Sequence, residues 1–215
     1  MIFNRYHCLK KVIRYLLTIP FNRTSDIIHK LLDAANPPTD SYLILQREAA
    51  DKFAGLSGRQ SLFSIVHAPW FAFEVVHRFQ PDDFTPKPSV AVIMLRCSQR
   101  TDPAITPDHR LLYEDFVSFI FNHANPNILP ALRSLFMDNQ FESILAGLGH
   151  NVTAKPSQLP PAAWLSLFQM FHQSASVKQL HLIQGTAKKL RVEAGTIEKH
   201  HRTRLSKQWR IESKS

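Results

Sequence analysis

The chain has 215 residues, enough for one large domain or two small ones, and 44% of them are hydrophobic and 20% charged. This composition is typical of a folded globular protein and excludes an intrinsically disordered chain. We also expect no membrane-spanning helix, because no apolar run approaches the roughly 20 residues needed to cross a bilayer.

The net charge of +9 is concentrated at the two ends of the chain. Residues 1–23 contain five basic residues and no acidic one, and residues 186–215 contain nine Lys or Arg and three Glu. The body between them is close to neutral. Basic ends on a near-neutral body indicate local contact with a polyanion such as a nucleic acid.

The first half of the chain predicts both helices and strands. Apolar residues on one face predict a helix over residues 24–32, which Thr24 or Ser25 would cap, and a short strand is expected over 42–45. Residues 47–56 are expected to form a helix. Periodicity does not decide whether the aromatic-rich residues 67–79 form a buried helix or a strand. The strongest strand pattern is the β-branched run 89–95.

The second half predicts helices, interrupted by one change of composition. Residues 111–122 and 128–137 have amphipathic helical patterns, and residues 162–171 restart a helix with large apolar side chains. Between them, the segment 149–161 contains three prolines and is expected to be a linker. We therefore place a domain boundary near residue 155.

The stretch from Thr186 to Leu205 has the pattern of two helices joined by a tight turn. Ala187 is small enough to lie where helices cross, and Leu190 and Val192 are expected to be apolar plugs at the end of the first helix. Gly195 permits a left-handed turn conformation, and Thr196 can cap the helix that follows.

In the second of these helices, Ile197, His201 and Leu205 recur on one face, which makes Ile197 and Leu205 expected core residues. The spacing predicts a helix-turn-helix, whose second helix enters the major groove of DNA.

The stretch from Ala187 to His200, and above all the block Gly-Thr-Ile-Glu-Lys-His from Gly195 to His200, resembles the LuxR-type (GerE-type) helix-turn-helix of bacterial regulators. The resemblance implies a four-helix DNA-binding domain at the C-terminus, dimeric on two-fold sites, and an N-terminal domain that receives a signal. The chain departs from the family pattern at 159–163, where an Arg-Glu pair is missing. The apolar positions after His200 are also displaced by one residue.

The resemblance leads to a prediction of fold and domains. The fold class is α+β: residues 1–155 form a mixed, helix-rich domain for sensing or dimerisation, and residues 156–215 form a small all-α helix-turn-helix domain. Residues 41–66 resemble the opening of a PAS sensor domain. The cluster of Trp70, Phe71 and Phe73 with Phe79 is interpreted either as core or as the lining of a pocket for a small-molecule effector.

The resemblance also implies the residues that contact DNA. The base contacts are Thr196, Lys199, His200 and Arg202, and the phosphate contacts are Lys188, Lys189, Arg204 and Lys207. His200 is equally compatible with a packed or capping role.

The predicted function is that of a sequence-specific DNA-binding transcription regulator, with double-stranded DNA as partner and a homodimer as its state. No enzyme is predicted, because the acidic pairs Asp82-Asp83 and Glu114-Asp115 lack catalytic spacing and no G-x-S-x-G or G-x-G-x-x-G motif occurs. No metal or cofactor is predicted, and the two cysteines fit the cytoplasm. The alternative is a non-enzymatic adaptor whose residues 1–23 contact a membrane surface.

Overall fold

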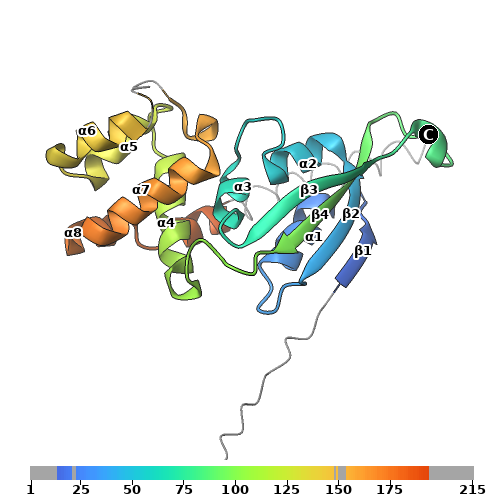
Figure 1. Ribbon diagram of the computed structural model, residues 1–215, viewed down its shortest axis with the longest axis horizontal. Coiled ribbons are helices and arrows are strands. Elements are labelled where there is room, and N and C mark those ends of the chain that lie inside the picture. The colour runs from blue at the N-terminus through green and yellow to red at the C-terminus, as the bar shows by residue number, and fades with distance from the viewer. Residues whose placement is uncertain (1–13, 21–22, 148, 150–153, 194–215) are drawn as a thin grey trace, which may run out of the picture. The chain divides into compact units, whose positions relative to one another are not determined.

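Strands and helices alternate in the first half of the chain, and the second half of the described chain is helical. The computed structural model describes residues 14–20, 23–147, 149 and 154–193 (Figure 1). It divides into two units, residues 1–104 and 105–215. The boundary predicted near residue 155 therefore falls inside the second unit.

The first unit is built on a four-stranded sheet with the strand order β1-β2-β4-β3. Its elements are β1 (Arg14–Thr18), α1 (Thr24–Leu32), β2 (Asp40–Gln46), α2 (Arg47–Ala54), α3 (Leu62–His67), β3 (Phe71–Arg78), the 3-10 helix η2 (Pro81–Asp83) and β4 (Val92–Gln99). β1 pairs in parallel with β2, and β4 pairs antiparallel with both β2 and β3. The predicted α+β class is therefore wrong, since a parallel pair joined by a helix is the unit of α/β folds.

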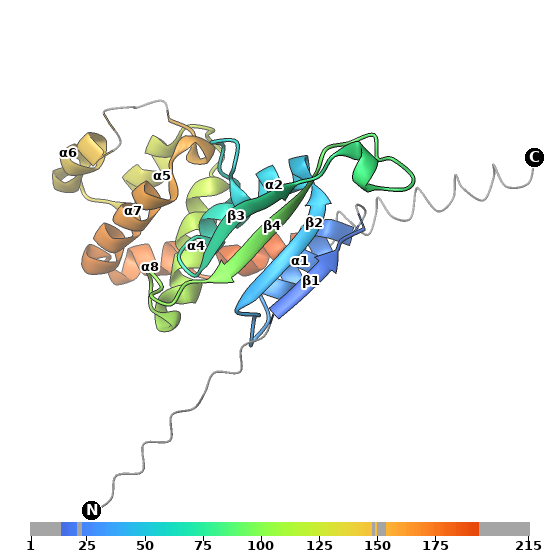
Figure 2. The ribbon, with the colours of Figure 1, turned by 45° about the vertical axis from the view of Figure 1, so that its right-hand side comes forward.

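One face of this sheet is buried by helices α1 to α3 (Figure 2). The directly opposed residues Leu43 and Leu95 both point to this face and are fully buried. On the other face, the opposed pair Tyr42 and Arg96 is only partly buried. The alternation of burial along β2 follows from the two-residue period of a strand.

Local sequence sets the ends of the helices over this face. α2 ends at Gly55, whose φ of 66° is in the left-handed region, and its N–H bonds to the carbonyl of Asp51 at 2.9 Å. α3 begins with a capping box, in which the hydroxyls of Ser61 and Ser64 each accept from the other residue's backbone N–H.

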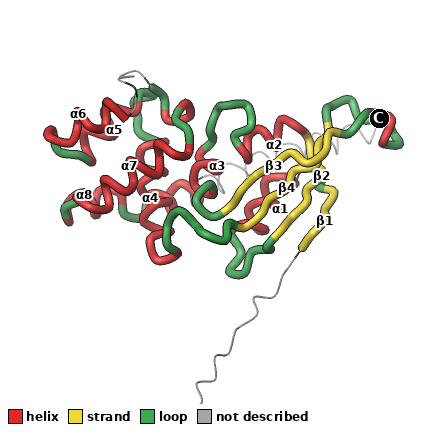
Figure 3. The backbone as a smooth tube through the Cα atoms, viewed as in Figure 1, coloured by secondary structure: helices red, strands yellow, loops and turns green. Residues whose placement is uncertain are grey.

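In the part of the second unit that the structure describes, the chain forms helices joined by loops and turns (Figure 3). Its elements are the 3-10 helix η3 (Pro107–His109), α4 (Arg110–Phe121), α5 (Ile128–Leu135), α6 (Asp138–Gly147), the 3-10 helix η4 (Pro156–Gln158), α7 (Pro161–Ser174), α8 (Val177–Ile183) and the helical residues 186–193. Phe116 of α4 lies between Phe168 and Phe171 of α7, with ring centroids 5.7 and 5.0 Å away. These contacts join the two longest described helices of the unit.

Most expected elements are confirmed within a few residues, including the helix at 24–32 and the strand at 89–95, observed as β4. The undecided residues 67–79 contain the end of α3 and strand β3. The missed elements include α6, α8 and β1, the last of which lies at residues 14–18 in the basic N-terminal segment, where no strand was predicted. Val192 is 64% exposed, so the prediction that it is a buried plug is wrong.

Candidate functional site

The carboxyl ends of the parallel strands β1 and β2 lie at one edge of the sheet, which we call the carboxyl edge. Just past β1, the N–H of Ile19 bonds to the carbonyl of Ile44 at 3.0 Å, so pairing continues to the end of the strand. Just past β2, the N–H of Arg47 bonds to the carbonyl of Ala91 at 2.9 Å. In open α/β sheets, ligands bind outside the carboxyl ends of the strands, so a ligand site is expected at this edge.

A polar pocket of about 470 Å³ opens at this edge. Its lining comes from the end of β2, the first turn of α2 and the residues before β4, namely Gln46, Arg47, Glu48, Asp51, Ser89, Val90 and Ala91. Arg47 and Asp51 form a long ion pair at 3.9 Å, with the guanidinium side chain 59% exposed. The pocket therefore offers one exposed cation together with carboxylate and amide acceptors.

A second pocket, of about 270 Å³, adjoins the polar one and shares Ser89, Val90 and Ala91 with it. It is lined by the loop between β3 and β4, chiefly by Phe79, Pro81, Phe84 and Pro88. The rings of Phe79 and Phe84 meet edge to face with centroids 5.2 Å apart. An apolar aromatic pocket beside a polar one suits a flat ring that carries hydrogen-bonding groups on its rim.

The opposite edge of the sheet, which we call the amino edge, is closed by polar contacts. At the start of β2, the guanidinium of Arg96 donates to one oxygen of Asp40 from two nitrogens, at 2.9 and 2.8 Å. The hydrogen bond and charge of Asp40 raise the pKa of Arg96 above its ordinary value. Gln99 and Arg100 donate to the backbone carbonyls of Pro37 and Ala68.

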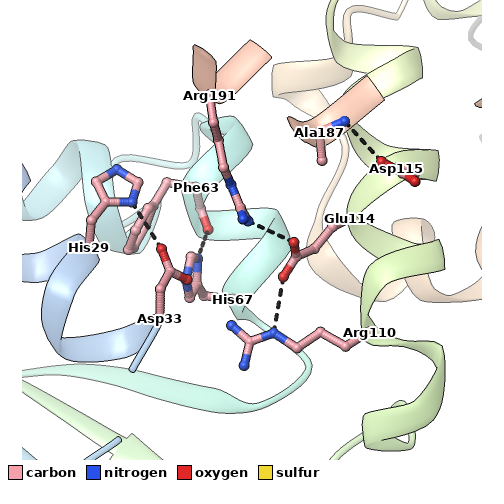
Figure 4. A network of polar contacts seen from close by, with 9 residues as sticks. All are labelled: His29, Asp33, Phe63, His67, Arg110, Glu114, Asp115, Ala187 and Arg191. Carbon is pink, nitrogen blue, oxygen red and sulfur yellow. Dashed lines mark hydrogen bonds and ion pairs between the residues drawn. The ribbon is translucent and has the colours of Figure 1, made fainter. Parts of the chain in front are cut away.

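A buried histidine belongs to the same edge (Figure 4). His67 is 2% exposed; its Nδ1 lies 2.9 Å from the carbonyl of Phe63 and its Nε2 lies 3.0 Å from Asp33. His29 reaches the second oxygen of Asp33 at 3.3 Å. These contacts bind α1 to α3.

The predicted site residues divide into two groups. Lys188 and Lys189 are exposed on the helical residues 186–193. The other predicted DNA contacts and the predicted turn lie outside the described residues. They are the base contacts Thr196, Lys199, His200 and Arg202, the phosphate contacts Arg204 and Lys207, and the turn at Gly195. Their roles stay predictions without a structural test.

Other residues that the sequence singled out have clear places. Trp70 and Phe71 are buried and line neither pocket at the carboxyl edge. Glu114 and Asp115 bond to Arg191 and Ala187, near the described C-terminal end. Within the described ranges, no group of three or more His, Cys, Asp and Glu is placed to hold a metal ion, and no helix is long and apolar enough to cross a membrane.

Sequence reasoning included Phe79 in a cluster that could line a pocket, but it missed Phe84, whose loop it described only as a proline-rich connection. A signal was available: Phe84 is a large aromatic residue in a loop with prolines on both sides. Binding residues are found disproportionately on loops that a rigid scaffold positions.

Comparison with known proteins gives a consistent result. A family model described as "Ribosomal RNA adenine dimethylase" matches residues 7–173. An rRNA adenine N-6-methyltransferase of Saccharopolyspora erythraea is 28% identical over 155 residues, which is 72% of this chain and 40% of that protein. A ribosomal RNA small subunit methyltransferase A of Pseudomonas fluorescens is 28% identical over 173 residues, 77% of this chain and 60% of that protein.

Solved structures agree with the sequence matches. The crystal structure of the 23S rRNA methyltransferase ErmE superposes with a TM-score of 0.68 at 27% identity, covering 74% of this chain and 65% of that one. A dimethyladenosine transferase from Plasmodium falciparum, at 16% identity and a TM-score of 0.55, supports the fold alone. The chain thus spans between 40% and about two thirds of the lengths of these relatives.

These findings correct several predictions. The LuxR-type resemblance, the sensory domain followed by a helix-turn-helix domain, and the DNA-binding regulator are wrong, because the matches are to ribosomal RNA methyltransferases with a mixed α/β fold. The prediction that the protein is not an enzyme is wrong for the same reason. Double-stranded DNA as partner, and the homodimer and effector inferred with it, are withdrawn. A helix, a glycine and a second helix with basic residues form a local pattern that unrelated helical segments share.

Proposed function

The chain belongs to the ribosomal RNA adenine dimethylase family, and we propose that it provides the RNA-binding edge of an enzyme that methylates adenine in ribosomal RNA. One observation of the structure carries the proposal: an aromatic pocket and a polar pocket adjoin at the carboxyl edge of the sheet. A cytoplasmic location, which the cysteine content suggested, is part of this proposal.

The aromatic pocket suits a base that has left its stack. Enzymes that modify a base inside folded nucleic acid turn it out into a pocket and hold it against aromatic or apolar side chains. Phe84, half-buried beside Phe79, presents such a ring in a loop next to the carboxyl end of β2. Stacking on an aromatic side chain contributes about 1–3 kcal/mol per base. We assign this role to Phe84.

The polar pocket suits the groups around the base. The exocyclic amine of adenine donates hydrogen bonds, and Glu48 and Asp51 offer carboxylate acceptors. Arg47, exposed at the rim, offers a cation for a backbone phosphate. Because the two pockets share the wall of residues 89–91, one nucleotide can reach both.

Methyl transfer also requires a methyl donor. S-adenosylmethionine, the general biological donor, is a nucleoside cofactor, and folds of this class hold nucleoside cofactors at a glycine-rich turn between a strand and a helix. The six glycines of the chain do not form such a motif, and none lies between β1 and α1. The described residues therefore show no donor site of this kind, and we derive no step through the donor.

The direct test measures methylated adenine. The 215-residue chain is incubated with ribosomal RNA and S-adenosylmethionine carrying an isotopic methyl label, and the RNA nucleosides are analysed by mass spectrometry. We expect label on the N6 atom of adenine. Phe84→Ala should lower kcat/KM by about 10- to 100-fold, the kinetic equivalent of one lost stacking contact. Phe84→Tyr, which keeps the ring, should retain activity.

A second measurement needs no methyl donor. Ultraviolet cross-linking of the chain to ribosomal RNA, followed by peptide mapping, should place adenine on the peptide that contains Phe79 and Phe84. Label on a base other than adenine, or equal activity of wild type and Phe84→Ala, would count against the proposal. Cross-links confined to other peptides would remove the carboxyl edge as the base site.

A further inference from the structure

The C-terminal part of the chain, residues 174–215, lies beyond the residues that match the family model. It contains ten Lys or Arg and three Glu, the most basic stretch of its length in the chain. The structure describes its first part, which contains α8 and the helical residues 186–193. Figure 4 shows how α4 holds the latter helix.

Asp115 of α4 caps the start of this helix. Its two carboxylate oxygens accept from the backbone N–H groups of Gly185 and Ala187, each at 2.9 Å. Gly185 has a φ of 77°, which allows the chain to turn between α8 and the helix. A side-chain carboxylate thus occupies the helix start, where an external anion would otherwise bind. Any phosphate must be held by side chains elsewhere on the helix.

Glu114, the neighbour of Asp115, fixes the same helix one turn later. It is 3% exposed and lies between two guanidinium groups: Arg110 donates to one oxygen at 3.0 Å and Arg191 to the other at 2.7 Å. Ala187, buried, and Arg191, paired, are four residues apart and therefore share the face toward α4. The helix has a defined inward face.

The outward face carries two lysines. Lys188 and Lys189 are exposed, and neither makes an ion pair with any described residue. The backbone that carries Lys188 and Lys189 is a helix that Asp115 and Glu114 bind to α4, so the positions of the two lysines are defined. Holding a helix lowers the ordering cost when its lysines meet a charged partner.

We propose that the helical residues 186–193 form an RNA-binding arm, in which Lys188 and Lys189 contact phosphates of ribosomal RNA and α4 sets their position. The choice of RNA rests on the proposed function, whereas the positive face and its anchor rest on the contacts above. Phosphate contacts fix the position of a protein on nucleic acid without reading its sequence. The arm would therefore add affinity for RNA without adding base specificity.

The experiment measures binding of the 215-residue chain to a fluorescein-labelled fragment of ribosomal RNA across a series of KCl concentrations. A plot of log affinity against log salt concentration has a negative slope, and the double variant Lys188→Ala, Lys189→Ala should reduce its steepness by about 2. The control variant Lys30→Ala, Lys52→Ala removes the same charge from exposed positions of α1 and α2, and should change the slope by less than half as much.

The anchor is tested by combining variants. Asp115→Ala alone should weaken RNA binding with both lysines present, and should weaken it much less in the Lys188→Ala, Lys189→Ala background, because the two act through one contact. Far-UV circular dichroism checks that each variant is folded. An equal change of the salt slope in the Lys188→Ala, Lys189→Ala variant and in its control would overturn the proposal that these residues form an RNA-binding arm. Equal binding of anionic lipid vesicles and RNA would also overturn it.

The arm and the proposed function can fail separately. RNA binding is measured without a methyl donor, so lysine-dependent binding by a chain that transfers no methyl group would keep the arm and remove the activity. Methylation that is unaffected by the loss of both lysines would keep the activity and remove the arm.

Discussion

The two edges of the sheet in the first unit differ in how their polar groups are used. At the amino edge, side chains and backbone satisfy one another: Arg96 bonds to Asp40, and His67 bonds to both Asp33 and Phe63. At the carboxyl edge, two pockets adjoin, and Arg47 is exposed with a long ion pair. Groups that are already paired hold elements together, whereas partly free groups remain available to a ligand.

This difference separates stability from function within one sheet. Changes at the amino edge should lower the free energy of unfolding, because they leave buried groups without partners. Changes at the carboxyl edge should alter RNA binding or methylation at almost constant stability.

The largest expected effect is that of His67→Ala. The ring is 2% exposed, stacks on Phe63 with centroids 3.9 Å apart, and bonds from both nitrogens. Its removal leaves a cavity and breaks the link between α1 and α3, which should cost about 2–4 kcal/mol of unfolding free energy. Urea denaturation followed by circular dichroism measures the loss.

His29→Ala is the matched control for this variant. His29 bonds to the same carboxylate at 3.3 Å, but its side chain is 51% exposed. Partly exposed pairs contribute little, so its loss should cost less than about 1 kcal/mol. Equal costs for the two variants would show that burial does not decide the strength of the amino edge.

The sequence predicted many of the strands and helices of the sheet, but not the contacts that these elements make at either edge. The run 89–95 is β-branched and continuous, as a central strand is, and β4 lies there with a shift of three residues. β1 was missed because, in the part that the structure describes, it is an edge strand with mostly exposed side chains. Without burial on one face, its sequence lacks the alternation that identifies a strand.

The site could not be predicted from local patterns, because contacts far apart in the sequence create it. The polar pocket depends on the bond between Arg47 and Ala91, which brings the start of α2 beside the residues before β4. Glu114 and Asp115 were recognised as an acidic pair, but their partners Arg191 and Ala187 lie more than 70 residues away. Periodicity carries no information about such pairs.

A second prediction concerns pH and Cys97, which lies opposite Ser41 near the amino edge. Burial raises the pKa of its thiol from 9.0 to about 12. Between these values the unfolded chain loses this proton while the folded chain keeps it, so stability falls as pH rises above 9.0. The loss approaches about 1.4 kcal/mol per pH unit.

Comparison of wild type with Cys97→Ala isolates this effect. The variant starts from lower stability because it leaves a small cavity. Between about pH 9 and about pH 10, ionisation of Cys97 in the unfolded chain should lower the stability of wild type by roughly 1 kcal/mol more than that of the variant. Urea denaturation at both pH values measures the slopes. Parallel slopes would mean that Cys97 ionises in the folded state, and that this part of the edge is open to water.

The smallest expected effect on stability is that of Arg47→Ala at the carboxyl edge. The side chain is 59% exposed and its ion pair with Asp51 spans 3.9 Å, so the unfolding free energy should change by at most about 0.5 kcal/mol. Loss of one phosphate contact should still make the dependence of log affinity on log salt concentration less steep by about 1. Arg59→Ala, an exposed arginine after α2, is the control and should leave that slope unchanged. A stability loss as large as that of His67→Ala, with unchanged RNA binding, would mean that Arg47 serves the fold and that the two edges do not divide the work.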